Sequence, residues 1–504
     1  MQKTNYDSDF CGSLPIHLTN LIQPYGVLLV IEPAAYQIVQ ASENTEAVFS
    51  RPAQEVVQTY LKDHLSAGTL ESLQQKLGQD VHAKVPAVWQ IGGQHFLVLI
   101  HRKEHYLLAE IDANALDAQA QKSFVDIYQE LKFVMSAIEA AATVEEGCVI
   151  AARELKRISG FDKVMAYSFD AEWNGHVVAE FGEPDMESYI GFTFPASDIP
   201  KQARQLYLKN PYRLIPDRDY KPVKLYPVVN PIAGSFIDLS DCNLRSVAAV
   251  HVEYLKNMGV VASMSTRILY QDNLWGLIAC HHKTPRYLSY EMCSVFEMLS
   301  GVISAKIASL QRQHAHTFKD SIRTTYAHLV ECVYKTGHLD SALLTDDGVL
   351  KLFNATGAAI SRNGRFIGAG DIPRREALEE LMLWLHTRQL KRVYHTDSLS
   401  REYEYAQEYS DIASGMLVIP INSARDQYLL IFRPEQVRVI NWGGNPADRI
   451  QFEKDQKNYH PRASFKQWQE KVSGISTAWS TEELEAAESL RSFIYEYDTY
   501  PVVD

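Results

Sequence analysis

The sequence predicts an α+β protein of three domains, in which antiparallel sheets are flanked by helices and a long helix connects the second domain to the third. Three observations predict this class. A chain of 504 residues suggests about three domains of ordinary size. Short apolar strands bounded by turns accompany amphipathic stretches in each third of the chain. Between Tyr290 and Lys335 there is no proline and no glycine after Gly301, which predicts one continuous helix.

Composition limits the class of protein. The content of 46% hydrophobic and 22% charged residues is typical of a globular protein. A net charge of −13 argues against a nucleic-acid partner, because phosphate binding needs clustered Lys and Arg. No apolar run approaches the roughly 18 residues of a membrane span, and the polar start lacks the core of a signal peptide. We therefore expect a cytosolic protein with no membrane partner.

The first domain, residues 1–128, is predicted from its order of elements. Residues 25–31 form an apolar strand, and 38–42 resemble its hairpin partner. Short helices are expected around 43–49 and 70–78, followed by strands at 87–91, 94–101 and 106–112. Two strands, short helices and three strands is the order of a PAS domain.

The second domain, residues 129–315, begins with helices predicted at 123–142 and 149–159. Strands are expected at 163–169, 261–270 and 275–280, with Gln271-Asp272-Asn273 as the turn between the last two. Helices on one side of an antiparallel sheet are typical of a GAF domain.

The third domain, residues 316–504, is also predicted to be GAF-like, with strands at 343–345, 358–360, 416–419 and 428–432. The polar stretch at about 437–472 is longer than most loops in compact domains, and such loops are usually functional or disordered. Ser480 and Glu483 have the spacing of a capping box, which predicts a helix from there to about residue 495.

Two segments carry the residues that suggest a site, and each residue also has an ordinary structural explanation. Asp198, before Ile199-Pro200, has the pattern of a helix N-cap. Arg213 and Arg245 alone would be surface charges. His251 alone would be a buried, hydrogen-bonded histidine, and it lacks the carboxylate at ligand spacing that a metal site needs. The six cysteines are scattered, with no C-x-x-C pair.

Together, the segments Phe194–Pro200, Arg245–Gly259 and the leader around Cys11 resemble the bilin-binding photosensory core of bacterial phytochromes. The resemblance runs from Cys11 to about Phe465. It implies PAS, GAF and PHY domains in a red/far-red photoreceptor, with biliverdin attached to Cys11 through a thioether. Plant and cyanobacterial relatives carry the attaching cysteine where this chain has Val250, so biliverdin is expected rather than a phycobilin. Attachment is self-catalysed, so no enzyme activity is implied.

The same resemblance assigns roles within the pigment pocket. It places the Asp198 main-chain carbonyl against the pyrrole nitrogens, His251 in the water network at the pigment centre, and His281 at the outermost ring, which rotates. Guanidinium groups suit two propionates because they form bidentate bonds to carboxylates. The full set of expected pigment contacts is Tyr167, Phe194, Asp198, Ile199, Pro200, Tyr207, Arg213, Arg245, His251, Tyr254, Ser263, Ser265 and His281.

Arg462 and Ser464 match the P-R-x-S-F motif of the family's tongue, the long loop of the PHY domain. The resemblance implies that Arg462 pairs with the Asp198 carboxylate in one state and gives way to Ser464 in the other. The tongue would refold from hairpin to helix, which is a bistable element biased by one contact.

The chain departs from the family pattern in three places, at four residues. Tyr25 stands where Gln-Pro-His-Gly has histidine, and Ala248-Ala249 replaces Ser-Pro. Arg267 replaces a small or apolar residue on the pocket strand. These changes leave pigment binding plausible and bear on photoproduct yield and absorption maximum.

The resemblance also implies partners. We expect a homodimer and signalling to an output domain, such as a histidine kinase acting on a response regulator. No output motif follows Tyr497, so the chain is either truncated after the sensor or has its output elsewhere. Two alternatives stay open, a GAF-bearing binder of cyclic nucleotide or haem and a regulatory fragment of a histidine kinase. The first would need neither Cys11 nor Arg462.

Overall fold

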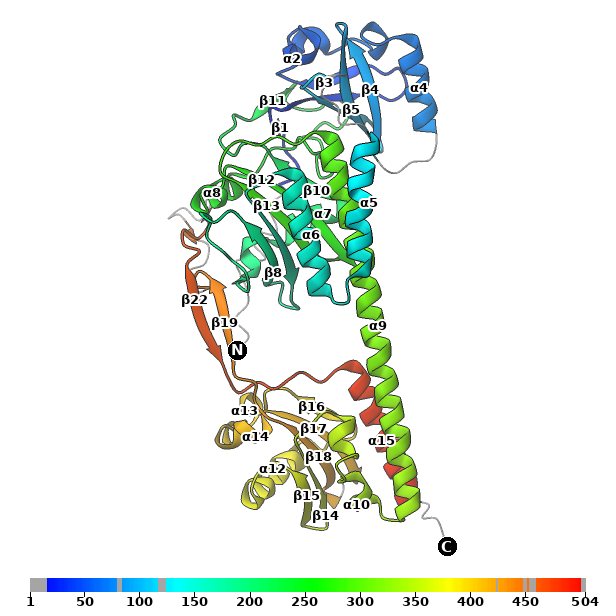
Figure 1. Cartoon of the computed structure of the whole chain (residues 1–504), viewed down its shortest axis with the longest axis vertical. Helices are drawn as coiled ribbons and strands as arrows, with labels where there is room; N and C mark the ends of the chain where they lie inside the picture. The colour runs from blue at the N-terminus through cyan, green and yellow to red at the C-terminus, as the bar shows by residue number, and fades with distance from the viewer. Residues whose placement is uncertain are drawn as a thin grey trace. The chain divides into compact units, whose positions relative to one another are not determined.

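A computed structural model describes residues 16–78, 84–116, 124–422, 425–446, 451–452 and 459–499. Cys11, predicted to attach the pigment, lies outside these residues. The described chain has the predicted α+β architecture of three domains with antiparallel sheets (Figure 1), apart from one parallel strand pair, Trp442 beside Thr193. By contacts it divides into two compact units, one of residues 1–310 with 441–468 and the other of residues 311–440 with 469–504.

The first sheet has seven strands in the order β1-β11-β3-β2-β6-β5-β4. The predicted order of two strands, short helices and three strands is present. The short helices are α2 (Glu46–Phe49), α3 (Ala53–Val56) and α4 (Ala67–Gly78). The strands are β1 (Leu21–Ile22), β2 (Gly26–Ile31), β3 (Ile38–Ser42), β4 (Val85–Ile91), β5 (Gln94–Arg102), β6 (Leu107–Asp112) and β11 (Val223–Tyr226). Sequence reasoning did not predict β11, which comes from far along the chain and pairs antiparallel with both β1 and β3.

The second sheet has eight strands in the order β10-β12-β13-β7-β8-β9-β19-β22. Its strands are β7 (Lys163–Phe169), β8 (Gly175–Gly182), β9 (Thr193–Phe194), β10 (Tyr212–Ile215), β12 (Ala262–Tyr270), β13 (Asn273–His282), β19 (Arg438–Gly443) and β22 (Gln467–Val472). Helices α5 (Phe124–Ala140) and α6 (Val144–Ser159) lie beside it (Figure 1). Thr143 caps α6, because its side chain accepts a hydrogen bond from the Glu146 N–H.

The predicted turn between β12 and β13 is a two-residue hairpin connection. Gln271 and Asp272 both have positive φ, 50° and 59°, and Tyr270 pairs with Asn273 across the turn. Positive φ at both central residues is the signature of the tight turns that match the twist of antiparallel strands. The turn therefore fixes the register of the two strands that carry the candidate site.

The connecting helix is continuous, as predicted. It is α9 (Tyr290–Thr336), of 47 residues. Among the described residues, this one helix is long and apolar enough to cross a membrane, with a mean hydropathy of 1.4 over its most apolar window. No uninterrupted apolar run of that length was expected from the sequence, because polar residues are spaced along this stretch. Phe296, Leu299 and Ile303 of this helix are buried in the core of the second domain, which explains its apolar face.

The third sheet has five strands in the order β15-β14-β18-β17-β16. The strands are β14 (Gly357–Arg362), β15 (Arg365–Gly370), β16 (Tyr394–Thr396), β17 (Gly415–Asn422) and β18 (Gln427–Arg433), and β20 (Gln451–Phe452) pairs separately with β21 (Tyr459–His460). The helices are α10 (Leu339–Leu343), α11 (Val349–Leu352), α12 (Arg375–Arg388), α13 (Leu399–Glu402) and α14 (Ser410–Ala413).

One strand prediction in this domain is wrong. Residues 343–345 form no strand; Leu343 ends helix α10, where Leu339, Ala342 and Leu343 are buried at helical spacing. A short apolar pair cannot distinguish the end of a buried helix from a strand.

The helix predicted near the end of the chain is present as α15 (Thr481–Thr499), and it extends beyond the predicted residue 495. Its capping box is formed as predicted. The Glu483 N–H donates to Ser480 Oγ at 3.1 Å, and the Ser480 N–H donates to Glu483 Oε2 at 2.9 Å.

Candidate functional site

A cavity of about 240 Å³ lies in the unit formed by residues 1–310 and 441–468. It is bounded by α7 (Lys201–Lys209), α8 (Ala249–Asn257), β12 and β13. The thirteen residues predicted to contact a pigment all line it: Tyr167, Phe194, Asp198, Ile199, Pro200, Tyr207, Arg213, Arg245, His251, Tyr254, Ser263, Ser265 and His281. Arg462 lines it too, whereas Ser464 does not.

Two guanidinium groups face the cavity together. Arg213 Nη1 donates to the Asn243 carbonyl at 3.1 Å, and its Nη2 donates to the Arg245 carbonyl. Arg245 is buried, and its Nε has no hydrogen-bond partner among the described residues. Burial, with the nearby Arg213 charge, lowers the pKa of Arg245 to about 9. Two cations this close, one of them incompletely paired, form a site suited to carboxylates.

Hydroxyl groups lie beside the guanidinium groups because of strand register. Arg213 on β10 is the partner of Ser265 on β12, and Ser263 lies two residues before it on the same face. Ser265 Oγ and the Tyr207 hydroxyl are 2.6 Å apart. A ligand carboxylate held by the arginines would therefore find further hydrogen-bond donors on the strand.

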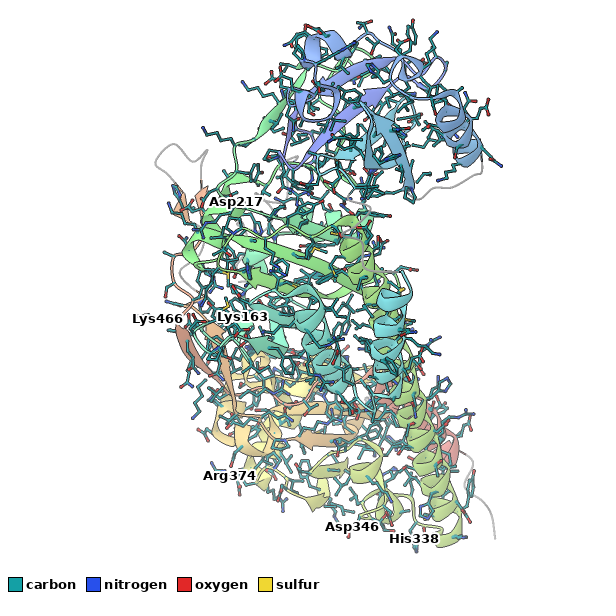
Figure 2. All side chains as sticks on the ribbon, turned by 45° about the horizontal axis from the view of Figure 1, so that its top comes forward. Lys163, Asp217, His338, Asp346, Arg374 and Lys466 are labelled. Atoms are coloured by element: carbon teal, nitrogen blue, oxygen red, sulfur yellow. The ribbon has the colours of Figure 1, made fainter. Side chains whose placement is uncertain are left out.

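The cavity is also lined by a buried histidine on β13. His281 is the register partner of Ser263, and its Nδ1 has no partner among the described residues. Burial, then the Lys163 and His251 charges, lowers the pKa of His281 to about 3. Lys163, labelled in Figure 2, is itself buried in β7 and lies 4.0 Å from the ring centroid of Tyr189. His281 is therefore neutral at pH 7 and has one ring nitrogen available to a ligand.

His251 lines the cavity and is exposed to its open space. The ring lies parallel to that of Tyr254, with centroids 6.0 Å apart and an interplanar angle of 9°. Enclosure by protein, then the charges of Arg213 and Arg245, lowers the pKa of His251 to about 4. A neutral imidazole can both donate and accept a hydrogen bond.

Asp198 is not a helix N-cap. It ends a 3₁₀ turn, Ala196–Asp198, and α7 begins only at Lys201, with Pro200 in the cap position. The Asp198 carboxylate instead accepts hydrogen bonds at Oδ2 from the Tyr254 hydroxyl at 2.9 Å and from Arg462 Nη2 at 2.5 Å. Burial raises the pKa of Asp198, and Arg462 and Tyr254 offset part of that rise.

Arg462 comes from the distant segment 459–468. Its side chain is 5% exposed, donates to the Gly443 carbonyl, and lies 4.8 Å from the ring of Phe465. Asn257 Nδ2 donates to the Arg462 carbonyl at 3.2 Å. Ser464 is exposed in this arrangement.

Sequence reasoning missed two residues that hold this segment. Phe465 is buried and packs edge-on against Tyr254, with ring centroids 5.1 Å apart. Asn257 follows Tyr254 by three residues on α8, so both lie on one face of the helix. Phe465 is the last residue of the P-R-x-S-F motif, and this position could have identified it from the sequence.

Comparison with known proteins assigns the family. Family models match a PAS fold at residues 11–114, a GAF domain at 143–307 and a phytochrome region at 322–498. A bacteriophytochrome of Xanthomonas campestris is 33% identical over 514 aligned residues, which cover 97% of this chain and 78% of that protein. The chain belongs to the phytochrome family.

Further phytochromes agree in sequence and in structure. Cyanobacterial phytochrome B of Nostoc sp. is 37% identical over 97% of this chain. The crystal structure of a bacteriophytochrome from R. palustris covers 98% of this chain and all of that chain, with a TM-score of 0.84 and 31% identity. The Stigmatella aurantiaca phytochrome photosensory core module covers 97% and 98%, with a TM-score of 0.81 and 34% identity. The chain spans 66%, 64% and 65% of three cyanobacterial phytochromes that it matches.

The structure settles where the three departures from the phytochrome pattern lie. Arg267 lies on the pocket strand β12, as expected, but it does not line the cavity; its Nη1 donates to the Tyr207 and Leu208 carbonyls at 2.9 and 2.7 Å. It caps the end of α7 beyond the pocket. Tyr25 also lies outside the lining, and its hydroxyl donates to the Asn243 carbonyl at 3.1 Å. Ala248 does line the cavity.

Proposed function

We propose that this phytochrome module is a red/far-red photoreceptor that binds biliverdin in the cavity and attaches it to Cys11 through a thioether. The observation that carries the proposal is the arrangement of the cavity, which has paired guanidinium groups in one part and a neutral, incompletely paired histidine in another. Biliverdin has two propionates and terminal-ring carbonyls, so both parts suit its chemistry. Bound biliverdin would supply light absorption and a double bond that isomerises.

The cavity residues would then act in three groups. Arg213 and Arg245 would bind the propionates, with Ser263 and Ser265 adding hydroxyl donors. The Asp198 carbonyl and His251 would accept hydrogen bonds from the pyrrole N–H groups. His281 would donate to the carbonyl of the outermost ring. The ring walls would be Tyr167, Phe194, Tyr207 and Tyr254, with Ile199 and Pro200 beside them.

The tongue, residues 437–472, would transmit the change. The support is that Arg462 pairs with a carboxylate next to the pocket wall while Ser464, two residues on, is exposed. Replacing the Arg462 contact with Ser464 would release one buried ion pair and allow the hairpin to refold as a helix. Two arrangements that differ by one contact meet the physical requirement for a switch.

The rest of the signalling system belongs to the same proposal. We infer that the module acts as a cytosolic homodimer and passes its state to an output domain, such as a histidine kinase with its response regulator. The relatives support the output domain, since the aligned region covers only 66% of cyanobacterial phytochrome B and 65% of a bacteriophytochrome of Pseudomonas aeruginosa.

The test is an absorbance spectrum of the purified protein mixed with biliverdin, before and after red light. We expect a sharp far-red band that is replaced by a band at longer wavelength and restored in darkness or far-red light. The Cys11→Ser variant should keep the band and lose pigment that survives denaturation. A band that does not change with light would leave a bilin binder without photochemistry. No band at all would favour a haem or cyclic-nucleotide binder.

A further inference from the structure

A buried cluster of polar groups connects the first sheet to the guanidinium pair, and none of its charged members lines the cavity. Glu110 on β6 is 4% exposed, and Lys84 precedes β4. Both come from the first domain. They contact residues 242–244, which directly precede Arg245 in the chain.

Both oxygens of the Glu110 carboxylate have partners. Oε2 accepts from the Leu244 N–H at 2.7 Å and from Cys242 Sγ at 3.1 Å. Oε1 lies 2.5 Å from Nε2 of His101, which is 3% exposed. An ionised carboxylate only accepts hydrogen bonds, so three donors around it form a consistent set.

Lys84 binds the same segment through the side chain of Asn243. Its Nζ donates to Asn243 Oδ1 at 2.8 Å and to Asn210 Oδ1 at 3.0 Å. Asn210 lines the cavity at the end of α7, and its Nδ2 donates to Asn243 Oδ1 at 2.8 Å. One ammonium group therefore ties the end of α7 to the segment before Arg245.

The held segment in turn positions the guanidinium groups. The carbonyl oxygens of Asn243 and Arg245 accept from the two terminal nitrogens of Arg213. The Leu244 N–H belongs to the same peptide group as the Asn243 carbonyl, and this N–H donates to Glu110. Any shift of this peptide would move both arginines.

We propose that Glu110 is a positioning residue, which fixes residues 242–245 so that Arg213 and Arg245 are set for the two carboxylates of the ligand. This inference rests on the proposed binding of a bilin. Burial alone would raise the pKa of Glu110, but His101, Lys84 and the Leu244 N–H lower it to about 2. The carboxylate is therefore charged across the useful pH range. Replacing it with an amide would remove the negative charge and turn one acceptor oxygen into an NH₂ donor, which would face another donor wherever it points at the Leu244 N–H.

The test compares binding of two probes, biliverdin and its dimethyl ester, to Cys11→Ser protein, in which binding is reversible. Glu110→Gln should weaken biliverdin binding about 5- to 150-fold, the range for one unsatisfied buried group. It should weaken binding of the ester much less, because the ester lacks the carboxylates. Glu104→Gln, an exposed change in the same domain (87% exposed), should alter neither affinity.

A second readout needs no pigment. In the pigment-free protein, Glu110→Gln should speed hydrogen exchange at the Leu244 amide and leave the Trp89 region of the same sheet unchanged. If Glu110→Gln fails to fold, Lys84→Met enters the same two-probe comparison, with the same expected preference for the ester.

The outcomes separate this inference from the proposed function. Equal loss of affinity for both probes would mean a general structural role and overturn the positioning role. Unchanged affinity for both would overturn it as well. If wild-type protein binds neither probe, the proposed function fails, and the inference fails with it.

Discussion

Asp198 and Arg462 form a buried ion pair whose two side chains are 6% and 5% exposed. Removing one member of such a pair typically costs 3–5 kcal/mol, because the other charge stays buried without its partner. The Tyr254 hydroxyl is the other donor that the structure shows on the Asp198 carboxylate. The pair therefore fixes the distant segment 459–468 beside the cavity only while Arg462 is present.

We predict that Arg462→Ala loosens this segment without preventing pigment binding. Amides of residues 459–468 should exchange at least tenfold faster, and the photoproduct should form more slowly or revert sooner. The measurements are hydrogen exchange and photoconversion kinetics. Arg438→Ala is the control, since Arg438 is exposed on the neighbouring strand and, among the described residues, hydrogen-bonds only to the nearby Gln436. Unchanged exchange and photochemistry in Arg462→Ala would remove the tongue switch.

The buried His281 should make the pigment-free protein sensitive to mild acid. Its pKa is about 3 in the folded protein against 6.5 for the free side chain, so the unfolded chain binds the proton more tightly. The contribution of neutral His281 to the free energy of unfolding is fully present above pH 6.5 and is lost as the pH falls toward 3. At pH 5 the loss is about 2 kcal/mol. His281→Gln should reduce the difference in unfolding free energy between pH 7 and pH 5 by about that amount.

Urea unfolding at the two pH values measures this difference. His105→Gln is the matched control, because the His105 side chain is 67% exposed and changes no buried group. If the unfolding free energy changes equally between pH 7 and pH 5 in His281→Gln and in wild type, His281 does not have the lowered pKa that its burial predicts.

At the residue scale, the lining of the pocket was predictable and its supports were not. Arg213, His251 and the other lining residues stand in recognisable motifs. Glu110 lies in an ordinary strand and Lys84 just before one, where a charge usually faces solvent, and only the fold shows that Glu110 is buried and Lys84 half-buried. The role of Asp198 was ambiguous for the opposite reason, because an acid before Ile-Pro suits both a helix cap and a ligand contact.

At the scale of elements, Gly444 allows the tongue to approach the pocket. Its φ is +101°, and a Cβ there would collide with the Ser464 carbonyl and lie 2.5 Å from Arg462 Nη1. We predict that Gly444→Ala displaces residues 462–464 and speeds their hydrogen exchange. Gly364→Ala is the control, since Gly364 has φ of +76° with nothing within 4 Å of the added Cβ. If both variants speed hydrogen exchange equally, and only near the substituted residue, then backbone strain explains the effect without any displacement of residues 462–464.

Long elements were predictable because their patterns are long. The 47 residues of α9 give a sustained helical pattern without proline. The four residues of β11 and the pair Leu343-Leu344 carry too little pattern to fix strand or helix. β11 pairs with β1 and β3, whose residues lie more than 180 positions earlier in the chain, and no local sequence pattern predicts such a pairing.

At the scale of the whole molecule, segment 441–468 belongs by contacts to the same unit as residues 1–310, although it lies more than 130 residues further along the chain. The cavity lies in that unit, and Arg462 is one of its lining residues. Ligand binding should therefore stabilise residues 459–468 together with the pocket. It should stabilise the unit of residues 311–440 and 469–504 less.

We predict that saturating biliverdin raises the unfolding transition of the pocket unit and leaves the transition of the other unit in place. A ligand that binds only the folded state at 1,000 times its Kd stabilises that state by about 4 kcal/mol. Calorimetry of Cys11→Ser protein, with and without biliverdin, measures both transitions, and hydrogen exchange should show new protection at residues 459–468. Biliverdin dimethyl ester at the same concentration is the control, expected to give a smaller shift because it cannot pair with Arg213 and Arg245. Equal shifts of both transitions would mean that the units unfold together and that the pocket does not end at the unit's boundary.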